Sequence, residues 1–204
     1  AVDGADDGVA ESKDFPMKRL IPSLPEEPHL GDVVQKFPHA FGPLLEYHDK
    51  VLRDDAELSI AERELIAAYV SGLNACAFCF GAHTLYARAF GISPETIEAL
   101  LADLSTAPVE DRLKPLLAYV AKLTREPSRL TEADAKAIYG AGWSEQALFE
   151  AVQVTALFNL MNRIVEGAGI TAFPMDPANA SEEEIERRRA RLYTDWGREI
   201  GLIE

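Results

Sequence analysis

The sequence predicts an all-α protein. Several segments carry apolar residues at helical spacing, helix-capping signals recur along the chain, and no stretch shows the alternation of a β-strand. With 204 residues, the chain is long enough for a sizeable core in one domain or in two closely packed halves. Because 48% of the residues are apolar, we expect a globular protein.

The first part of the chain is acidic and rich in proline. Residues 1–16 carry five acids and little that could enter a core, so we expect a loose acidic N-terminal arm. Residues 21–28, with three prolines, should run extended into the first helices. These helices are expected near 31–36 and 41–53.

Capping signals place the helices in the middle of the chain. Ser59 and Glu62 have the spacing of a capping box, which predicts that a helix begins at Ser59. Ser93 followed by Pro94 predicts another helix start, because proline is favoured at the first helical position. The helices expected in this region are 59–71, 74–90 and 94–103.

The later part of the chain continues the helical pattern. Residues 116–123 are helical in pattern, and Thr131 and Ser144 each begin a further helix, the second running to about residue 166. Apolar residues recur in this helix at helical spacing, so one side of it should be buried. From Ser181 we expect one terminal helix, with acids at its start and arginines after them, matching the helix dipole.

We divide the chain into the arm, a helical domain over 17–175 and a C-terminal helical extension over 176–204. A faint repeat of about fifty residues, in which 65–73 resembles 116–123, predicts two related helical units packed together. The second unit has no cysteine at the matching positions, so each chain should hold one site.

The charge of the chain excludes some partners. Its net charge is −14 and its pI is near 4.7, which argues against binding to nucleic acid or to an anionic membrane, because both would be repelled. The acidic start does not resemble a signal peptide, and no run of about twenty apolar residues occurs. We therefore expect a cytoplasmic protein.

The candidate site is built around the chain's two cysteines, Cys76 and Cys79, which have the spacing C-x-x-C and are followed by His83. On one helix these three side chains fall within about 60° of one another, so two sulfurs and an imidazole converge. A disulfide that closes so short a loop removes little chain entropy and is a poor structural link. The pattern therefore indicates redox or metal chemistry.

Two arguments disagree on which cysteine attacks. With Asn74 as the N-cap, Cys76 would lie in the first turn, where the helix dipole favours a thiolate. Cys79, in contrast, has His83 one turn away as a proton acceptor. We choose Cys79.

Glu64 lies twelve residues before Cys76, about 18 Å away if one unbroken helix joined them. A bend at 71–74, where glycine ends one helix and asparagine starts the next, would fold Glu64 back towards the Cys/His face.

A glutamate, eleven residues and then C-x-x-C-x-x-x-H resembles the pattern of the alkylhydroperoxidase D (AhpD)-like group of the carboxymuconolactone decarboxylase family, in its peroxidase-related branch. The resemblance covers roughly residues 15–170 and includes LSIAERELIAAYVSGLN and FNLMNR. It implies an AhpD-like helical fold for 17–175.

The resemblance also implies thiol-dependent peroxide reduction without a cofactor. Cys79 would attack the peroxide, Cys76 would resolve the sulfenic acid into a disulfide, and Glu64 and His83 would relay protons. The implied partners are a peroxide, an unidentified dithiol reductant and further copies of the chain in a dimer, trimer or hexamer. The chain departs from the family pattern at Phe78, where better-known members have a histidine.

Three alternatives remain open. Cys76, Cys79, His83 and Glu64 form an acceptable ligand set for zinc. The name of the wider family implies a decarboxylase or lactone-processing enzyme. The chain could also be a non-catalytic oligomeric scaffold or a redox sensor.

Further polar residues stand out less clearly. Asparagine is a poor helix former, so the asparagines of FNLMNR, with the arginine beside them, indicate that these side chains have a role in packing, at an interface or in the site. These residues are Asn159, Asn162 and Arg163. The histidines His29, His39 and His48 have no partner pattern and receive no role.

Overall fold

The computed structural model describes residues 19–170 and 173–204, and every regular element within them is helical, which confirms the all-α class. The helices of the described residues are α1 (Leu30–Lys36), α2 (Phe41–Leu52), α3 (Ile60–Leu73), α4 (Ala77–Ala89), α5 (Pro94–Ala102), α6 (Leu113–Arg125), α7 (Glu132–Gly140), α8 (Glu145–Ala168), α9 (Glu182–Ala190) and α10 (Tyr193–Glu199), with 3₁₀ turns η1 (Pro127–Arg129) and η2 (Pro177–Asn179). The predicted arm over 1–16 lies outside the described residues.

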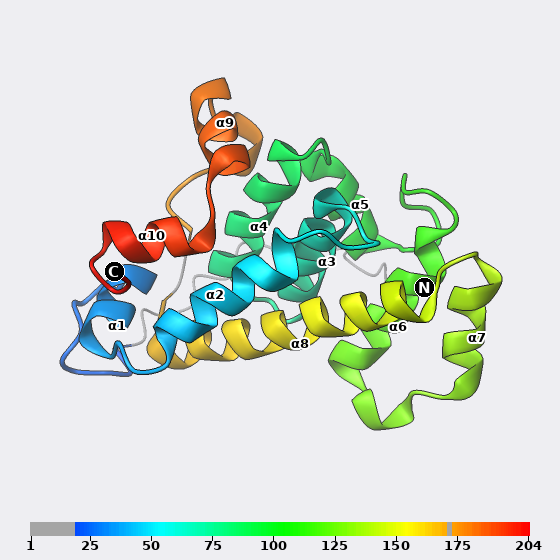
Figure 1. The fold of residues 1–204 in the computed structure, drawn as a ribbon, viewed down its shortest axis with the longest axis horizontal. Coiled ribbons are helices and arrows are strands. Elements are labelled where there is room, and N and C mark those ends of the chain that lie inside the picture. Colours follow the sequence, from blue (N-terminus) through cyan, green and yellow to red (C-terminus); the bar gives the residue numbers. More distant parts are fainter. Residues whose placement is uncertain (1–18, 171–172) are drawn as a thin grey trace, which may run out of the picture.

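Helix α3 lies in the middle of the fold and packs against α4, α5, α6 and α8 (Figure 1). Nine of its fourteen residues are buried, because its apolar residues run around the helix and need neighbours on several sides. The largest hydrophobic cluster joins α3 to α6 and α8 through residues such as Leu65, Leu116 and Phe158.

Four expected helix starts are confirmed as N-cap residues: Ser59, Ser93, Thr131 and Ser144. The capping box at the start of α3 is also present. The Ser59 hydroxyl accepts from the backbone N–H of Glu62 at 3.2 Å, and the Glu62 carboxylate accepts from the backbone N–H of Ser59 at 2.7 Å. These bonds satisfy N–H groups that the helix itself leaves unpaired.

The predicted bend at 71–74 is wrong in detail. Helix α3 continues through Gly72, and Asn74 is its C-cap rather than the N-cap of α4. Gly72 serves packing instead, because a β-carbon there would lie 2.5 Å from Cδ1 of Leu101 in α5. Glycine therefore lets α5 approach α3 closely.

The reversal between α3 and α4 occurs at Ala75, which has the left-handed φ of 54°. The N–H groups of Ala75 and Cys76 bond to the carbonyls of Gly72 and Ser71, each at 3.0 Å. This is the Schellman arrangement, which more often has glycine in the left-handed position. The turn leaves α3 and α4 packed side by side.

Two helices occupy the C-terminus where the sequence predicts one over 181–196, so that prediction is wrong. Arg191 and Leu192 are extended, with ψ of 135° and 158°. A new helix begins after them because the Asp49 carboxylate of α2 accepts the backbone N–H of Tyr193 at 2.6 Å and that of the next residue at 3.1 Å.

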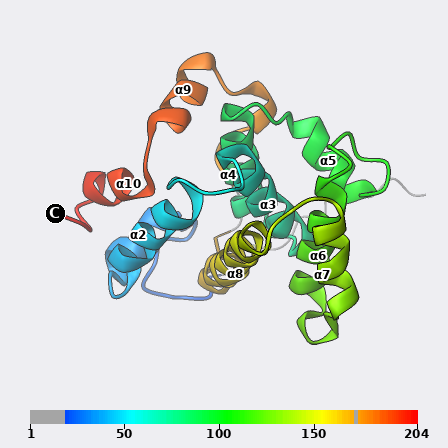
Figure 2. The same ribbon diagram turned by 45° about the vertical axis from the view of Figure 1, so that its right-hand side comes forward.

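The C-terminal helices form an arch, with α9 on α4 and α10 on α2 (Figure 2). Ile185 of α9 packs with Leu85 and Ala89 of α4 in a small hydrophobic cluster. None of the described helices is both long enough and apolar enough to cross a bilayer. The domain division at residue 176 and the fifty-residue repeat stay predictions.

Candidate active site

The two cysteines flank the start of α4: Cys76 is its N-cap residue and Cys79 its third residue. The expected place of Cys76 in the first turn is therefore wrong, and Cys79 lies there instead. Unpaired backbone N–H groups and the helix dipole in that turn favour a thiolate at Cys79. Both thiols are free and buried, although Cys79 keeps 4% of its surface exposed.

The two thiols have opposite surroundings. A hydrogen bond from the Cys76 thiol lowers the pKa of Cys79, although burial opposes this shift. The same bond, together with burial, raises the pKa of Cys76. The Asn162 side chain also hydrogen-bonds to Cys79 and lowers its pKa further. Cys79 is therefore the thiol that ionises more readily.

Asn162 is held in place by hydrogen bonds to the end of α3. Its Nδ2 donates to Oγ of Ser71 at 3.1 Å, and its Oδ1 accepts from Nδ2 of Asn74 at 2.9 Å. Asn74 also donates to Asn159 at 3.2 Å, while Arg163 donates to the Asn159 side chain at 2.9 Å. The polar residues of FNLMNR thus tie α8 to the turn that carries Cys76.

Packing of α3 on α4 brings Glu64 to His83, and the Glu64 carboxylate is fully buried. It accepts from Nδ1 of His83 at 2.7 Å and from Nη1 of Arg53 at 2.6 Å. Burial works to raise the pKa of Glu64, but the Arg53 charge and the contact with His83 lower it to about 2. Because an ionised carboxylate only accepts hydrogen bonds, Nδ1 of His83 carries a proton, and Nε2 is the ring nitrogen left to serve as an acceptor.

Tyr193 of α10 completes the cluster. Its hydroxyl donates to the Glu64 carboxylate at 3.2 Å, and its ring stacks on His83 with centroids 6.3 Å apart. Burial raises the pKa of Tyr193, so the phenol stays protonated. The Arg53 guanidinium lies over the rings of Tyr193 and Tyr86, at 5.0 and 5.1 Å from their centroids. The C-terminal extension is therefore part of the site.

A cavity of about 410 Å³ opens beside this cluster, and both Cys79 and His83 line it. Its size is typical of a small-molecule site. Its apolar lining includes Leu45, Phe78, Phe158, Met161, Phe173 and Trp196. A small apolar molecule that enters the cavity therefore meets the thiol with the lower pKa.

Phe78 gives the cavity an aromatic wall at the position where the resemblance leads one to expect histidine. Its ring meets Phe173 edge to face, with centroids 5.7 Å apart. A β-carbon at Gly81 would lie 2.8 Å from Cβ of Phe173, so glycine allows this segment to close against α4. The wall adds apolar surface in place of a protonatable group.

Sequence reasoning missed three residues of the site: His48, Arg53 and Tyr193. His48 lines the cavity, and burial lowers its pKa to about 4, so its ring is neutral at pH 7. Its Nδ1 donates to the backbone carbonyl of Leu44 at 2.7 Å. None of the three belongs to a motif, and only the fold brings them to Glu64 and His83.

The zinc alternative lacks its ligand set. Among residues 19–170 and 173–204, no group of three or more histidine, cysteine, aspartate or glutamate side chains is placed to hold a metal ion. The Glu64 carboxylate, one of the four proposed ligands, faces Arg53 instead.

Comparisons with known proteins agree with this architecture. The sequence pattern of the carboxymuconolactone decarboxylase family matches residues 38–122, which include all four predicted site residues. A comparison with curated proteins found no significant match.

Solved structures share the fold. An uncharacterized peroxidase-related protein from Silicibacter sp. TM1040 is 26% identical with a TM-score of 0.62, over 67% of this chain and 73% of that chain. A peroxidase-related protein from Ralstonia eutropha JMP134, described as an alkylhydroperoxidase AhpD core, is 21% identical with a TM-score of 0.66, over 86% of this chain and 96% of that chain. A protein of unknown function from Agrobacterium tumefaciens, named as a candidate antioxidant defence protein AhpD, is 21% identical with a TM-score of 0.59, over 71% of this chain and 97% of that chain. Residues 38–122 therefore carry the sequence pattern of the carboxymuconolactone decarboxylase family, and the fold of the chain is AhpD-like.

Proposed function

We propose that the protein is a thiol-dependent peroxide reductase that cycles Cys76 and Cys79 between dithiol and disulfide. One observation carries the proposal: Cys79, the thiol with the lowered pKa, lines a cavity together with His83 and has Cys76 within hydrogen-bonding distance. The similar proteins described as peroxidase-related and as an AhpD core support it.

In the first step Nε2 of His83 takes the proton of Cys79, while Glu64 holds the imidazole in the required tautomer. The thiolate attacks one peroxide oxygen, so that an S–O bond forms and the O–O bond breaks. The leaving alkoxide takes the proton from His83 and departs as alcohol. Cys79 is thereby oxidised to a sulfenic acid, and the peroxide is reduced.

In the second step the Cys76 sulfur attacks the sulfenic sulfur of Cys79. The S–S bond forms, and hydroxide leaves with the proton of Cys76 as water. The raised pKa of Cys76 leaves Cys79 as the thiol that attacks the peroxide first, because Cys76 keeps its proton while it donates to Cys79. An external dithiol then reduces the disulfide by exchange and is itself oxidised.

The reaction thus needs two partners, a peroxide and a dithiol reductant. We place it in the cytoplasm, where dithiols are kept reduced. A decarboxylase or lactone-processing enzyme would have no use for a neighbouring resolving thiol, and a passive scaffold would need neither the lowered pKa of Cys79 nor its place at a cavity.

The test mixes fully reduced protein with one equivalent of cumene hydroperoxide and follows both peroxide and free thiols. We expect one peroxide to be consumed for each pair of thiols lost, and the thiols to return with dithiothreitol. Air-oxidised protein should show no free thiols under denaturing conditions and two after reduction. Unchanged thiols and peroxide would overturn the proposal, and two free thiols with stoichiometric zinc would favour the metal site.

A further inference from the structure

The cavity that reaches Cys79 carries positive charge in an otherwise acidic protein. Arg188 and Arg191, from the C-terminal segment, are among its lining residues. No aspartate or glutamate of the described chain lines it, although the net charge of the protein is −14. The peroxide chemistry uses neither arginine, so their presence in the wall calls for another explanation.

Arg188 is held in a fixed orientation and is still able to donate. Its Nε donates to Glu184 at 2.7 Å and its Nη1 to the hydroxyl of Tyr86 at 3.4 Å. The guanidinium also lies over the rings of Tyr86 and Phe173, at 5.2 and 5.9 Å from their centroids. Within the described residues, Nη2 of Arg188 donates to no protein atom. Such a fixed guanidinium can receive an anion at little entropic cost.

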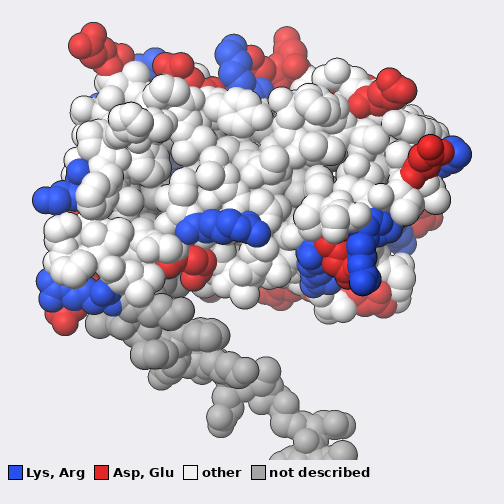
Figure 3. All heavy atoms as spheres, turned by 90° about the horizontal axis from the view of Figure 1, so that it is seen from below, with Lys and Arg blue, Asp and Glu red and all other residues white. Residues whose placement is uncertain are grey.

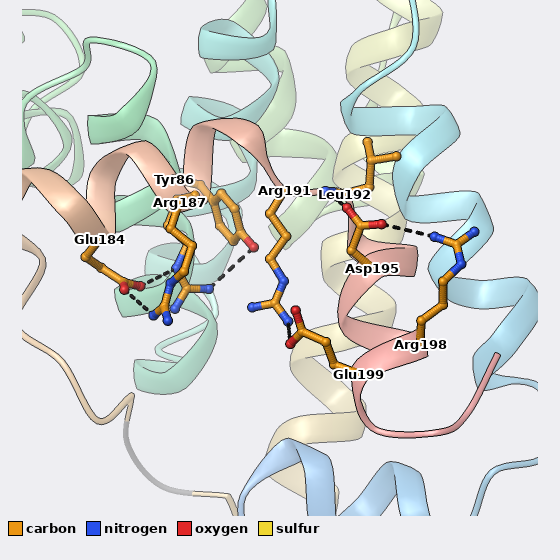
Figure 4. A network of polar contacts seen from close by, with 9 residues as sticks. Tyr86, Glu184, Arg187, Arg191, Leu192, Asp195, Arg198 and Glu199 are labelled. Atoms are coloured by element: carbon orange, nitrogen blue, oxygen red, sulfur yellow. Dashed lines mark hydrogen bonds and ion pairs between the residues drawn. The ribbon is translucent and has the colours of Figure 1, made fainter. Parts of the chain in front are cut away.

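Arg191 provides a second donor. It pairs with Glu199 through Nη2, as Figure 4 shows. Its Nε is buried and has no hydrogen-bond partner among the described residues. Buried N–H groups are rarely left unpaired in proteins, and this one belongs to a side chain that lines the cavity.

The carboxylates that pair with the two arginines lie outside the cavity wall. Arg188 pairs with Glu184, which Arg187 also contacts, and Arg191 pairs with Glu199. Neither Glu184 nor Glu199 lines the cavity, so only the guanidinium side of each pair borders it. An anion in the cavity would meet these two guanidinium groups, and a carboxylate has the planar shape that guanidinium groups bind best.

We propose that Arg188 and Arg191 bind the carboxylate of an amphipathic substrate, a hydroperoxide of a medium-chain carboxylic acid. Its chain lies along the aromatic wall, and its hydroperoxide group reaches Cys79. The hydroperoxide part of this inference rests on the proposed function, whereas the carboxylate subsite is argued from the two arginines alone.

The test compares two probes without a peroxide group, decanoate and decanamide, which have the same chain and nearly the same shape. Calorimetry on the reduced full-length protein measures binding, and the fluorescence of Trp196 in the cavity wall reports it independently. Decanoate should bind roughly tenfold more tightly, as expected for charge-assisted hydrogen bonds. Equal affinities would overturn the subsite.

Variants test whether Arg188 and Arg191 cause the tighter binding of decanoate. Arg188→Gln and Arg191→Gln should each lower the affinity for decanoate roughly tenfold and leave decanamide unchanged. Arg187→Gln is the matched control, because Arg187 shares Glu184 but is 59% exposed and is not part of the cavity wall. An equal loss in the control would show that general surface charge, and not a subsite, attracts the anion. Should a glutamine variant not fold, the ratio of the two affinities in the unaltered protein still decides.

Kinetics separates this inference from the proposed function. In Arg188→Gln the KM for a fatty-acid hydroperoxide should rise roughly tenfold more than the KM for cumene hydroperoxide, which has no carboxylate. Arginine-dependent binding of decanoate without any peroxide consumption would contradict the proposed function and support the subsite. Consumption of cumene hydroperoxide without a preference for decanoate would support the function and overturn the subsite.

Discussion

The Glu64 carboxylate on α3 accepts a hydrogen bond from Nδ1 of His83 on α4 at 2.7 Å, although nineteen residues separate the two in the chain. The same carboxylate binds Arg53 and Tyr193, and the Arg53 charge together with the contact to His83 keeps it ionised. We therefore propose that Glu64 orients His83 without exchanging protons itself, so that a change at Glu64 would act on Cys79 through His83.

Replacing Glu64 by glutamine should cost about 3 to 5 kcal/mol of unfolding free energy at pH 7, because the buried Arg53 charge loses its partner. The pKa of Glu64 is lowered from 4.5 to about 2 in the folded protein. The unfolded chain thus binds the proton more readily, so the stability that Glu64 contributes is complete above pH 4.5 and is lost as the pH falls towards 2. Urea unfolding should show a smaller difference in unfolding free energy between wild type and variant at pH 3 than at pH 7.

Asp134→Asn is the control for this pH dependence. Asp134 also has a pKa lowered to about 2, first by its bond to Lys122, but it lies at the surface, where solvent screens the charge. Its loss should change stability much less. If wild type and Glu64→Gln differ in unfolding free energy by the same amount at pH 7 and pH 3, this result would contradict the assignment of Glu64 as a buried ion.

Asn162→Ala should raise the pKa of the Cys79 thiol, because Asn162 adds to the effect of Cys76 in stabilising the thiolate. The pH dependence of iodoacetamide alkylation in the Cys76→Ser background measures this change. Peroxide consumption at pH 7 should fall by roughly threefold to tenfold. Asn159→Ala is the matched control, since Asn159 bonds to Asn74 but has no contact that shifts the pKa of Cys79. Equal alkylation curves for the two variants would refute the role of Asn162.

Cys79→Ser should abolish peroxide consumption, whereas Cys76→Ser should allow one turnover and leave a sulfenic acid on Cys79. The reason is that Cys79 lies in the first turn of α4 and has the lower pKa. Dimedone labelling followed by mass spectrometry identifies the oxidised cysteine. Label on Cys76 in the Cys79→Ser protein, with none on Cys79 in the reverse variant, would reverse the assignment.

Tyr193→Phe should remove one hydrogen bond from Glu64 and lower the unfolding free energy by about 0.5 to 1.5 kcal/mol. Because the carboxylate that orients His83 becomes less constrained, peroxide consumption should fall several-fold. Tyr139→Phe, at a tyrosine that is 40% exposed, should change neither quantity. Calorimetry and a peroxide assay measure the two effects, and a Tyr193 variant that behaves like this control would exclude α10 from the site.

We predict that the chain forms a homo-oligomer, a dimer, trimer or hexamer. On α8, Phe149 and Leu160 are 58% and 47% exposed. Figure 3 shows the molecule from below the view of Figure 1, and few charged side chains lie in the middle of the surface seen there. Exposed apolar surface of this kind favours association. Light scattering should show more than one chain per particle, and Leu160→Glu should dissociate it, whereas Leu20→Glu, at an exposed leucine that is not part of α8, should not. A wild-type monomer would contradict the prediction.

Local signals carry the parts of the fold that the sequence predicts well. The capping box of Ser59 and Glu62 forms within four residues, so its geometry depends on little else. The convergence of Cys79 and His83 likewise needs only one turn of helix. The reversal at Ala75 escaped prediction because the left-handed position usually belongs to glycine, and the packing of α3 on α4 imposes it on alanine instead.

The sequence by itself determined the all-α class, most helix starts and the spacing of Cys79 and His83 by one helical turn, since all of these follow from interactions within a few residues. Tertiary structure alone decided that Arg53 and Tyr193 hold Glu64, that Cys79 and not Cys76 lies in the first turn, and that Arg188 enters a cavity beside the thiol. Each of these depends on a contact between distant segments. Such contacts follow from how apolar faces pack, and no local pattern encodes them.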